Sequence, residues 1–200
     1  MEDQNSKHAA RPQPLVDQYL AHRVPGELEL VRQFVNTYDV EDDVDEIASP
    51  AALRDWLSQH GLGPGAEIGE ADVGRARALR DALRALTLAN NGEPLDPQAI
   101  PTLNSVAETA RLQLRFGDQG ETRLEPAGEG IEAALGRMLA IVFRAMADGT
   151  WPRLKACREH TCQWAFYDLS KNRSATWCTM KVCGNRNKAR AYRARHRTAG

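Results

Sequence analysis

The chain has 200 residues, of which 42 % are apolar, and its 26 Lys and Arg nearly balance its 27 Asp and Glu. These values are those of an ordinary soluble protein of one or two domains. The charge is unevenly divided, because residues 151–200 carry 12 Lys and Arg against 2 Asp and Glu, net +10, whereas residues 1–150 carry 14 against 25, net −11. The chain is therefore composed of two pieces of opposite charge.

Neither export nor membrane insertion is expected. The N-terminal residues lack the apolar core of a secretory signal, and no run of about 18 uninterrupted apolar residues occurs. We therefore expect a cytoplasmic protein. Reducing conditions there disfavour structural disulfides, so the four cysteines of the chain need another explanation.

The first half of the chain gives mainly helical signals. Residues 1–25 are polar and proline-containing, which indicates a flexible lead-in. Apolar residues recur at helical spacing over 27–38, and an acidic run after them predicts a solvated loop. A Ser-Pro start and a glycine stop bound a short helix over 49–61. A longer amphipathic helix is predicted over 71–89.

The pattern changes once before the domain ends. Another helix is predicted to start at Pro97. Within 112–124, apolar residues then alternate with polar ones on either side of a glycine-containing turn, which predicts a β-hairpin. Residues 131–146 give the strongest helical pattern, ending near Gly149. We expect residues 26–150 to form a mostly helical α+β domain. It contains no phosphate loop, nucleophile elbow or paired His, so we expect no enzyme; an unrecognised enzyme here is the weaker alternative.

The cysteines form the most specific motif of the sequence. All four lie within one short segment and pair as C-x4-C, fifteen residues, C-x4-C. Such pairs can place four thiolates tetrahedrally around Zn²⁺ and fill its coordination shell. Four buried thiols or two disulfides are the alternative, and His160 is an alternative ligand. We expect a structural zinc site with the ligands Cys157, Cys162, Cys178 and Cys183.

Residues 151–200 are expected to form a small zinc finger around this site. About fifty residues with a strong positive charge cannot bury enough apolar surface to fold alone, whereas zinc supplies folding free energy. A small core around the metal is predicted from Trp151, Leu154, Trp164, Phe166, Tyr167 and Trp177.

Good helix formers without proline follow Cys183 and predict a C-terminal helix. Four arginines recur along one of its faces, and planar guanidinium groups suit phosphate. We therefore expect nucleic acid, and double-stranded DNA first, as the partner. Asn185 has two candidate roles, a base contact and a helix cap. The candidate contact residues are Arg173, Lys181, Asn185, Arg186, Lys188, Arg190, Arg193, Arg195 and Arg197.

Other partners stay open for this helix. An acidic protein, including the chain's own N-terminal domain, would make the finger a protein-interaction module. Docking on the N-terminal domain would also cover the basic helix and inhibit its binding to nucleic acid. RNA is a weaker alternative, because aromatic residues of the finger that were exposed would favour single strands.

The cysteine segment resembles the CGNR zinc-finger family, named after the tetrapeptide at 183–186. The resemblance extends over FYD at 166–168, WC at 177–178 and the basic tail with Tyr192. It implies that the four cysteines bind zinc. Members often carry basic residues before the WC pair, where this chain has Ala-Thr, so a phosphate contact from that loop is expected to be weaker here.

The upstream sequence resembles the ABATE domain that accompanies this finger. The matching motifs are FVNT at 34–37, LRDWLSQHGL at 53–62 and ALRDALRAL at 78–86. The resemblance implies a bacterial, stress-induced transcription regulator.

The sequence thus predicts an α+β protein in three parts. These are a lead-in (1–25), a mostly helical ABATE-like domain with a β-hairpin (26–150), and a four-cysteine zinc finger ending in a basic helix (151–200). We expect a zinc-dependent, DNA-binding regulator whose N-terminal domain senses a small-molecule or protein effector or supports homo-oligomer formation.

Overall fold

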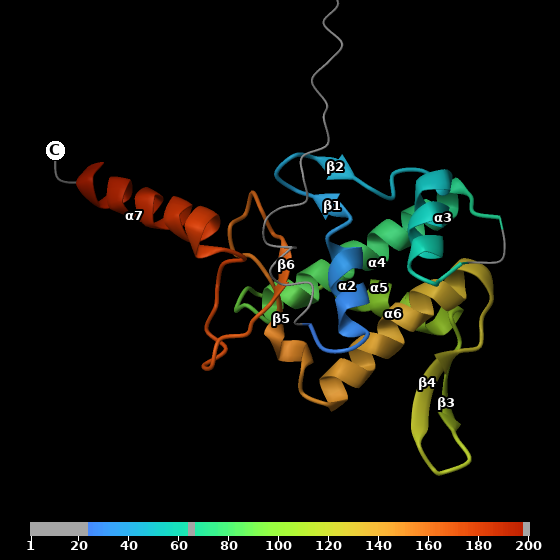
Figure 1. Ribbon diagram of the computed structural model, residues 1–200. Helices are drawn as coiled ribbons and strands as arrows, with labels where there is room; N and C mark the ends of the chain where they lie inside the picture. Colours follow the sequence, from blue (N-terminus) through green and yellow to red (C-terminus); the bar gives the residue numbers. More distant parts are fainter. Residues whose placement is uncertain (1–23, 64–66, 198–200) are drawn as a thin grey trace, which may run out of the picture.

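The computed structural model describes residues 24–63 and 67–197. The predicted lead-in therefore lies outside the described residues, apart from its last two. Helices make up most of the fold (Figure 1). Their bounds are α2 (Leu28–Val35), α3 (Pro50–Gln59), α4 (Glu70–Ala89), α5 (Ala99–Thr109), α6 (Gly130–Ala147) and α7 (Asn185–Arg197).

The strands form three separate antiparallel pairs. They are β1 (Tyr38–Asp39) with β2 (Val44–Asp45), β3 (Leu112–Phe116) with β4 (Thr122–Pro126), and β5 (Leu154–Ala156) with β6 (Ala165–Tyr167). The predicted α+β class, with its β-hairpin at 112–124 and its final helix, is confirmed.

The acidic run differs from its prediction as a solvated loop, because β1 and β2 lie within it. Asp45 pairs with Tyr38 in the strand register and receives a hydrogen bond of 2.7 Å from Arg80 on α4. Arg77 adds an ion pair of 2.8 Å to the same carboxylate. These arginines compensate the charge of Asp45 and attach the end of the acidic run to the helical body.

The main core is formed by apolar faces of α2, α3, α4 and α6. The predicted spacing of apolar residues provides one fully buried side chain of this core from each helix: Val31, Leu53, Leu79 and Met138. Ser49 caps α3, as predicted, because its Oγ accepts a hydrogen bond of 3.2 Å from the Ala52 N–H. Each of these four helices is stabilised because its apolar stripe is buried against the other helices of the core.

The β5–β6 hairpin shares this main core, which the sequence did not predict. Trp151, Leu154, Ala165 and Tyr167 all belong to it. Phe166 points to the other side and packs with Trp177 near the cysteines. The reason is strand alternation, which sends neighbours in β6 to opposite faces. The predicted separate aromatic core around the metal is therefore reduced to Phe166 and Trp177.

Asn36, just after α2, fixes β6 to the helical body. Its Nδ2 donates to the Ala165 carbonyl at 3.0 Å, and its Oδ1 accepts from the Ala165 N–H at 2.7 Å. Both partners are buried. One side chain thus satisfies both main-chain groups of a strand residue that lies 129 positions away in sequence.

Asn90 and Asn91, which follow α4, attach β5 to the helical body. Their side-chain amides donate to the carbonyls of Trp151 and Leu154 (Asn90) and of Ala156 and Thr176 (Asn91), at 2.8–2.9 Å. The sequence indicates these residues only as a helix end. In the structure they attach β5 and the segment before Cys178 to α4.

Within the described residues, none of the helices is both long and apolar enough to cross a membrane.

We predict that Asn36→Ala lowers the free energy of unfolding by about 1–3 kcal/mol, because it leaves the buried N–H and C=O of Ala165 without partners. Urea unfolding of the zinc-loaded chain measures this value. Asn104→Ala is the matched control, since Asn104 is exposed on α5. Equal stability of the two variants would contradict the role of Asn36.

Candidate metal centre

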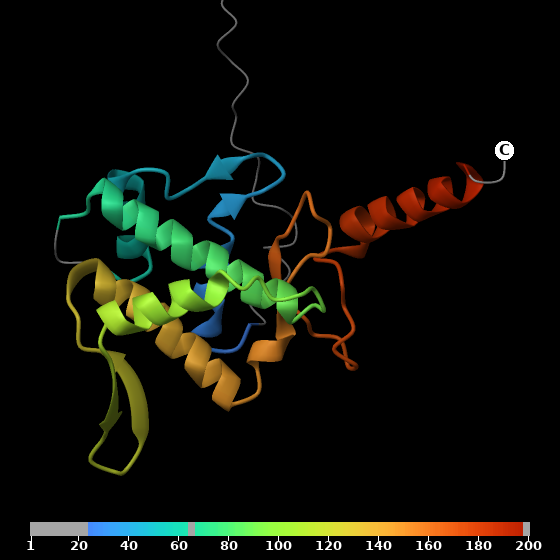
Figure 2. The ribbon, with the colours of Figure 1, turned by 180° about the vertical axis from the view of Figure 1, so that it is seen from behind.

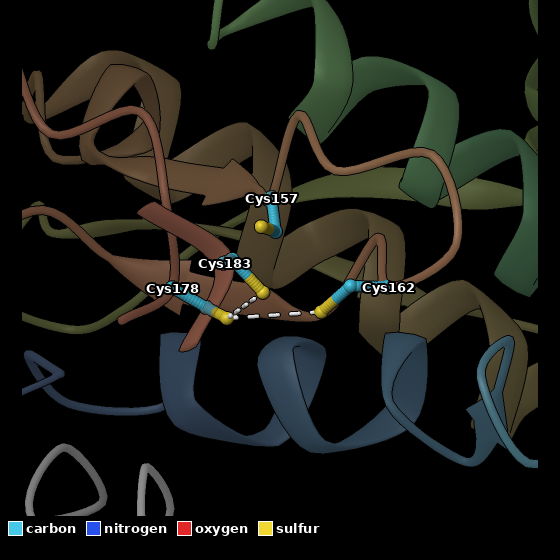
Figure 3. A group of neighbouring side chains, drawn as sticks. All are labelled: Cys157, Cys162, Cys178 and Cys183. Carbon is cyan, nitrogen blue, oxygen red and sulfur yellow. Dashed lines mark hydrogen bonds between the residues drawn. The ribbon is translucent and has the colours of Figure 1, made fainter. Parts of the chain in front are cut away.

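The four cysteines come from two loops that meet beside β6. Cys157 directly follows β5, and Cys162 lies in the loop that leads to β6. Cys178 precedes, and Cys183 lies within, a π-helical turn over Met180–Gly184 that continues into α7. Figure 3 shows the four side chains converging on one point. Chain segments separated by the predicted fifteen-residue loop are thus brought together.

The distances fit a tetrahedral metal ion. All four Sγ atoms lie within 4.8 Å of one another, and Sγ of Cys178 lies 3.7 Å from those of both Cys162 and Cys183. A Zn–S bond of about 2.3 Å gives a tetrahedral S···S edge of about 3.8 Å. A disulfide needs about 2.05 Å, so the cysteines are free thiols.

His160 is not part of this group. Its side chain is 70 % exposed and faces the carboxylate of Glu159 at 3.2 Å. The group that the described residues form for a metal ion consists of the four cysteines alone. Four sulfur donors fill the coordination shell of zinc, so the ion would stabilise the fold and leave no position for a substrate.

Without metal, the four thiols share their protons unequally. Hydrogen bonds from Cys162 and Cys178 lower the pKa of Cys157 to about 2. The same contacts with Cys157 raise the pKa of Cys162 and Cys178, and burial raises that of Cys183. The four thiols therefore influence one another strongly, and Cys157 is the one that loses its proton most readily.

Glu159 connects the first cysteine pair to α7. Its buried carboxylate accepts hydrogen bonds from Asn187 Nδ2 at 2.8 Å and from Arg190 at 3.2 Å. Burial opposes ionisation, but the hydrogen bond and charge of Arg190 outweigh it and lower the pKa of Glu159. Asn187 also donates to the Cys183 carbonyl at 3.0 Å. Both cysteine pairs are thus linked to the first turns of the helix.

Asp168 plays a similar part in the loop between the cysteine pairs. Its carboxylate receives Lys155 Nζ at 2.7 Å and the N–H of Ala175 at 3.0 Å, and both charged side chains are buried. Lys155 also donates to the Arg173 carbonyl at 2.6 Å. This ion pair fixes the loop, Arg173 included.

Sequence reasoning missed the roles of Glu159 and Asp168, although a signal was available. They are the only acidic residues in the segment 151–200, which contains 12 Lys and Arg. Both are buried and paired with a cation.

All the predicted nucleic-acid contacts up to Arg195 have exposed side chains, namely Arg173, Lys181, Asn185, Arg186, Lys188, Arg190, Arg193 and Arg195. Some of them also have partners within the chain: Arg186 donates to Glu41 at 2.6 Å, Arg190 to Glu159, and Asn185 to the Lys181 carbonyl at 3.1 Å. Asn185 thus orders the turn before α7. Arg197 ends α7, and only its backbone is described.

We predict that zinc binding at pH 7 releases protons, because the raised pKa values of Cys162, Cys178 and Cys183 keep protons on these thiols in the metal-free protein and all four cysteines must be thiolates in the complex. Zinc affinity therefore falls as the pH is lowered. Calorimetry in buffers of different ionisation enthalpy counts these protons. Binding without proton release would contradict the assignment.

We also predict that Glu159→Gln keeps zinc but loosens the start of α7, since it removes the charge that holds Arg190. Hydrogen exchange of the amides from Asn185 to Arg190 should become faster at unchanged zinc content. Glu108→Gln, an exposed change on α5, is the control. Equal exchange in both variants would show that Glu159 does not hold the helix.

Comparison with protein families confirms both resemblances. Residues 28–149 match ABATE, described as "Putative stress-induced transcription regulator", and residues 153–196 match the CGNR zinc finger. No match was found among curated proteins. The ABATE match covers more than half of the sequence. The chain therefore belongs to the ABATE family and carries a CGNR zinc finger after the ABATE region.

Proposed function

We propose that the protein is a zinc-dependent transcription regulator that binds duplex DNA through α7 and the loops at its base. The ABATE region would sense an effector and hold the finger. Four free thiols fit a reducing cytoplasm. The metal site in this proposal has a structural role and no catalytic one, because four thiolates saturate the ion.

The observation that carries this proposal is the position of α7. The helix leaves the body of the protein and projects into solvent in both views (Figures 1 and 2). From Lys188 to His196 every side chain is exposed. A helix that is polar on all sides gains little from packing within its own chain. Such a helix, rich in arginine, is suited to an external polyanion.

The dimensions and chemistry favour duplex DNA. A helix of 13 residues is about 20 Å long, and the major groove of B-DNA is about 12 Å wide and admits a helix. The deep, narrow major groove of RNA does not. Stacking on single strands needs exposed aromatic rings. In the finger Trp151, Phe166 and Tyr167 are buried and Trp164 and Trp177 are partly buried, whereas Tyr192 on α7 is 59 % exposed. Stacking would therefore rest mainly on this one ring.

The role of the zinc ion would be to fix the position of α7 relative to the loops at its base, and the ion would take no part in a reaction. Zinc, when bound, would draw the four thiolates into one rigid unit. Asn187 and Arg190 would then hold the start of α7 against Glu159. The exposed Lys188 and Arg193 would in turn be held at a fixed distance from the loop residues Arg173 and Lys181.

One contact favours a second candidate, a module whose basic helix docks an acidic surface. Arg186 at the base of α7 pairs with Glu41 of the acidic β1–β2 loop at 2.6 Å. The two side chains are 40 % and 33 % exposed, and a pair of this kind contributes up to about 1 kcal/mol. It holds only the base of the helix, so most of α7 stays accessible.

We predict that Arg193→Ala weakens duplex DNA binding for all sequences and lowers the magnitude of the salt slope by about 1, because one phosphate contact is lost. Fluorescence anisotropy of the zinc-loaded full chain over a salt series, with heparin as competitor, measures this. The control is Arg144→Ala, an exposed arginine on α6. Unchanged affinity in Arg193→Ala, or no preference for DNA over heparin, would contradict the proposal.

We further predict that Glu41→Gln changes DNA affinity by no more than about fivefold, the equivalent of the 1 kcal/mol expected for an exposed ion pair. The same titration measures it, with Glu108→Gln as control. A much larger increase would show that the acidic loop masks the helix and would favour the docking function.

A further inference from the structure

The β3–β4 hairpin exposes apolar side chains far from the finger. It projects from the helical body in both views (Figures 1 and 2). Leu112, Leu114 and Phe116 share one face with their cross-strand partners. Leu114 is 56 % and Phe116 72 % exposed. A protruding pair of large apolar residues is a mark of an interaction surface.

The hydrogen-bond pattern shows which main-chain groups are free. Bonds at the two ends of the ladder, Gly117 N–H to the Glu121 carbonyl and Ala127 N–H to the Arg111 carbonyl, fix its phase. Because bonded and non-bonded pairs alternate, the N–H and C=O groups of Leu112, Leu114 and Phe116 point away from β4. No other described strand pairs with β3. The outer edge of β3 therefore presents a row of donors and acceptors.

The hairpin adjoins the body through β4 and its base. A side chain at Gly136 of α6 would meet the Cβ atoms of Ala110 at 2.5 Å and Pro126 at 3.1 Å. This close approach orients the hairpin against α6, while Leu114 and Phe116 of β3 remain exposed. Two strands alone are marginally stable in water. A further strand would complete the sheet.

The two outer edges of the hairpin, on β3 and on β4, differ in their ability to pair with a further strand. On β4 the outward positions include Pro126, which has no N–H to donate. Residues 122–126 also line a groove of about 790 Å³ against α6, so this edge adjoins the body. The β3 edge has no proline and carries one charge, Arg115, on its polar face.

β3 is also complementary to itself. In an antiparallel pairing centred on Leu114, Leu112 of each copy lies opposite Phe116 of the other, and all outward donors meet acceptors. On the polar face Gln113 lies opposite Arg115, so no like charges oppose each other. A pairing in which the same patch serves both partners closes at two copies.

We propose that the outer edge of β3 is a self-association surface, on which a second copy of this chain adds its own β3 to form a four-stranded antiparallel sheet. The six side chains Leu112, Leu114 and Phe116 of the two copies would then form one apolar strip. This proposal does not depend on DNA binding, because self-association would use only β3, whereas DNA binding is proposed for α7 and the loops at its base.

Charge substitution at the centre of the pairing tests it. Sedimentation of the zinc-loaded full chain should give twice the chain mass of 22.2 kDa. Leu114→Lys and Leu114→Glu should each be monomers, because like charges would face each other across the two-fold axis. Mixing the two variants should restore the dimer. Thr122→Lys, at an exposed position on the same face of β4, should remain a dimer.

The proposal would be overturned if the wild-type chain were monomeric or if either Leu114 variant dimerised alone. It would also be overturned if the mixture of the two Leu114 variants stayed monomeric, or if Thr122→Lys dissociated the dimer. Circular dichroism and zinc content verify folding of each variant. Failure to bind DNA would not alter these masses, so the two proposals are tested separately.

Discussion

The fold of the C-terminal segment depends on bringing four thiols from two loops to one point. The sulfur atoms lie at the spacing of a tetrahedral zinc site. Without an ion, thiol protons connect the two loops only through weak hydrogen bonds of Cys178 with Cys162 and Cys183. A bound ion would replace these protons and convert the cluster into a rigid junction. The position of α7 follows from that junction, because Cys183 lies directly before the helix and Glu159 beside its first turns.

The finger is continuous with the ABATE region. Its β5–β6 hairpin completes the main hydrophobic core, and three asparagines from the helical body satisfy its main chain. A conformational change in α2 or α4 would therefore reach the strands next to Cys157 directly. The proposed regulation of α7 by the ABATE region would use this connection.

Local patterns predicted most of the fold. The helices of the core, the β3–β4 hairpin and the four converging cysteines all have regular spacing in the sequence. The roles of Asn36, Glu159 and Asp168 could not be predicted in this way, because each depends on a partner that only the tertiary fold supplies. The strands β5 and β6 have three residues each, too few for alternation to be recognised. Arg190 shares a predicted face with Arg193, yet it donates a hydrogen bond to the buried Glu159.

The central claim is that metal binding orders the basic helix on a hairpin that the ABATE core holds. Hydrogen exchange of the full chain, compared with zinc and after chelation, tests it most directly. The account predicts that chelation removes protection from Cys178 through the first turns of α7, while the amides of α4 and α6 stay protected. Equal protection of the α7 amides in both states would contradict it.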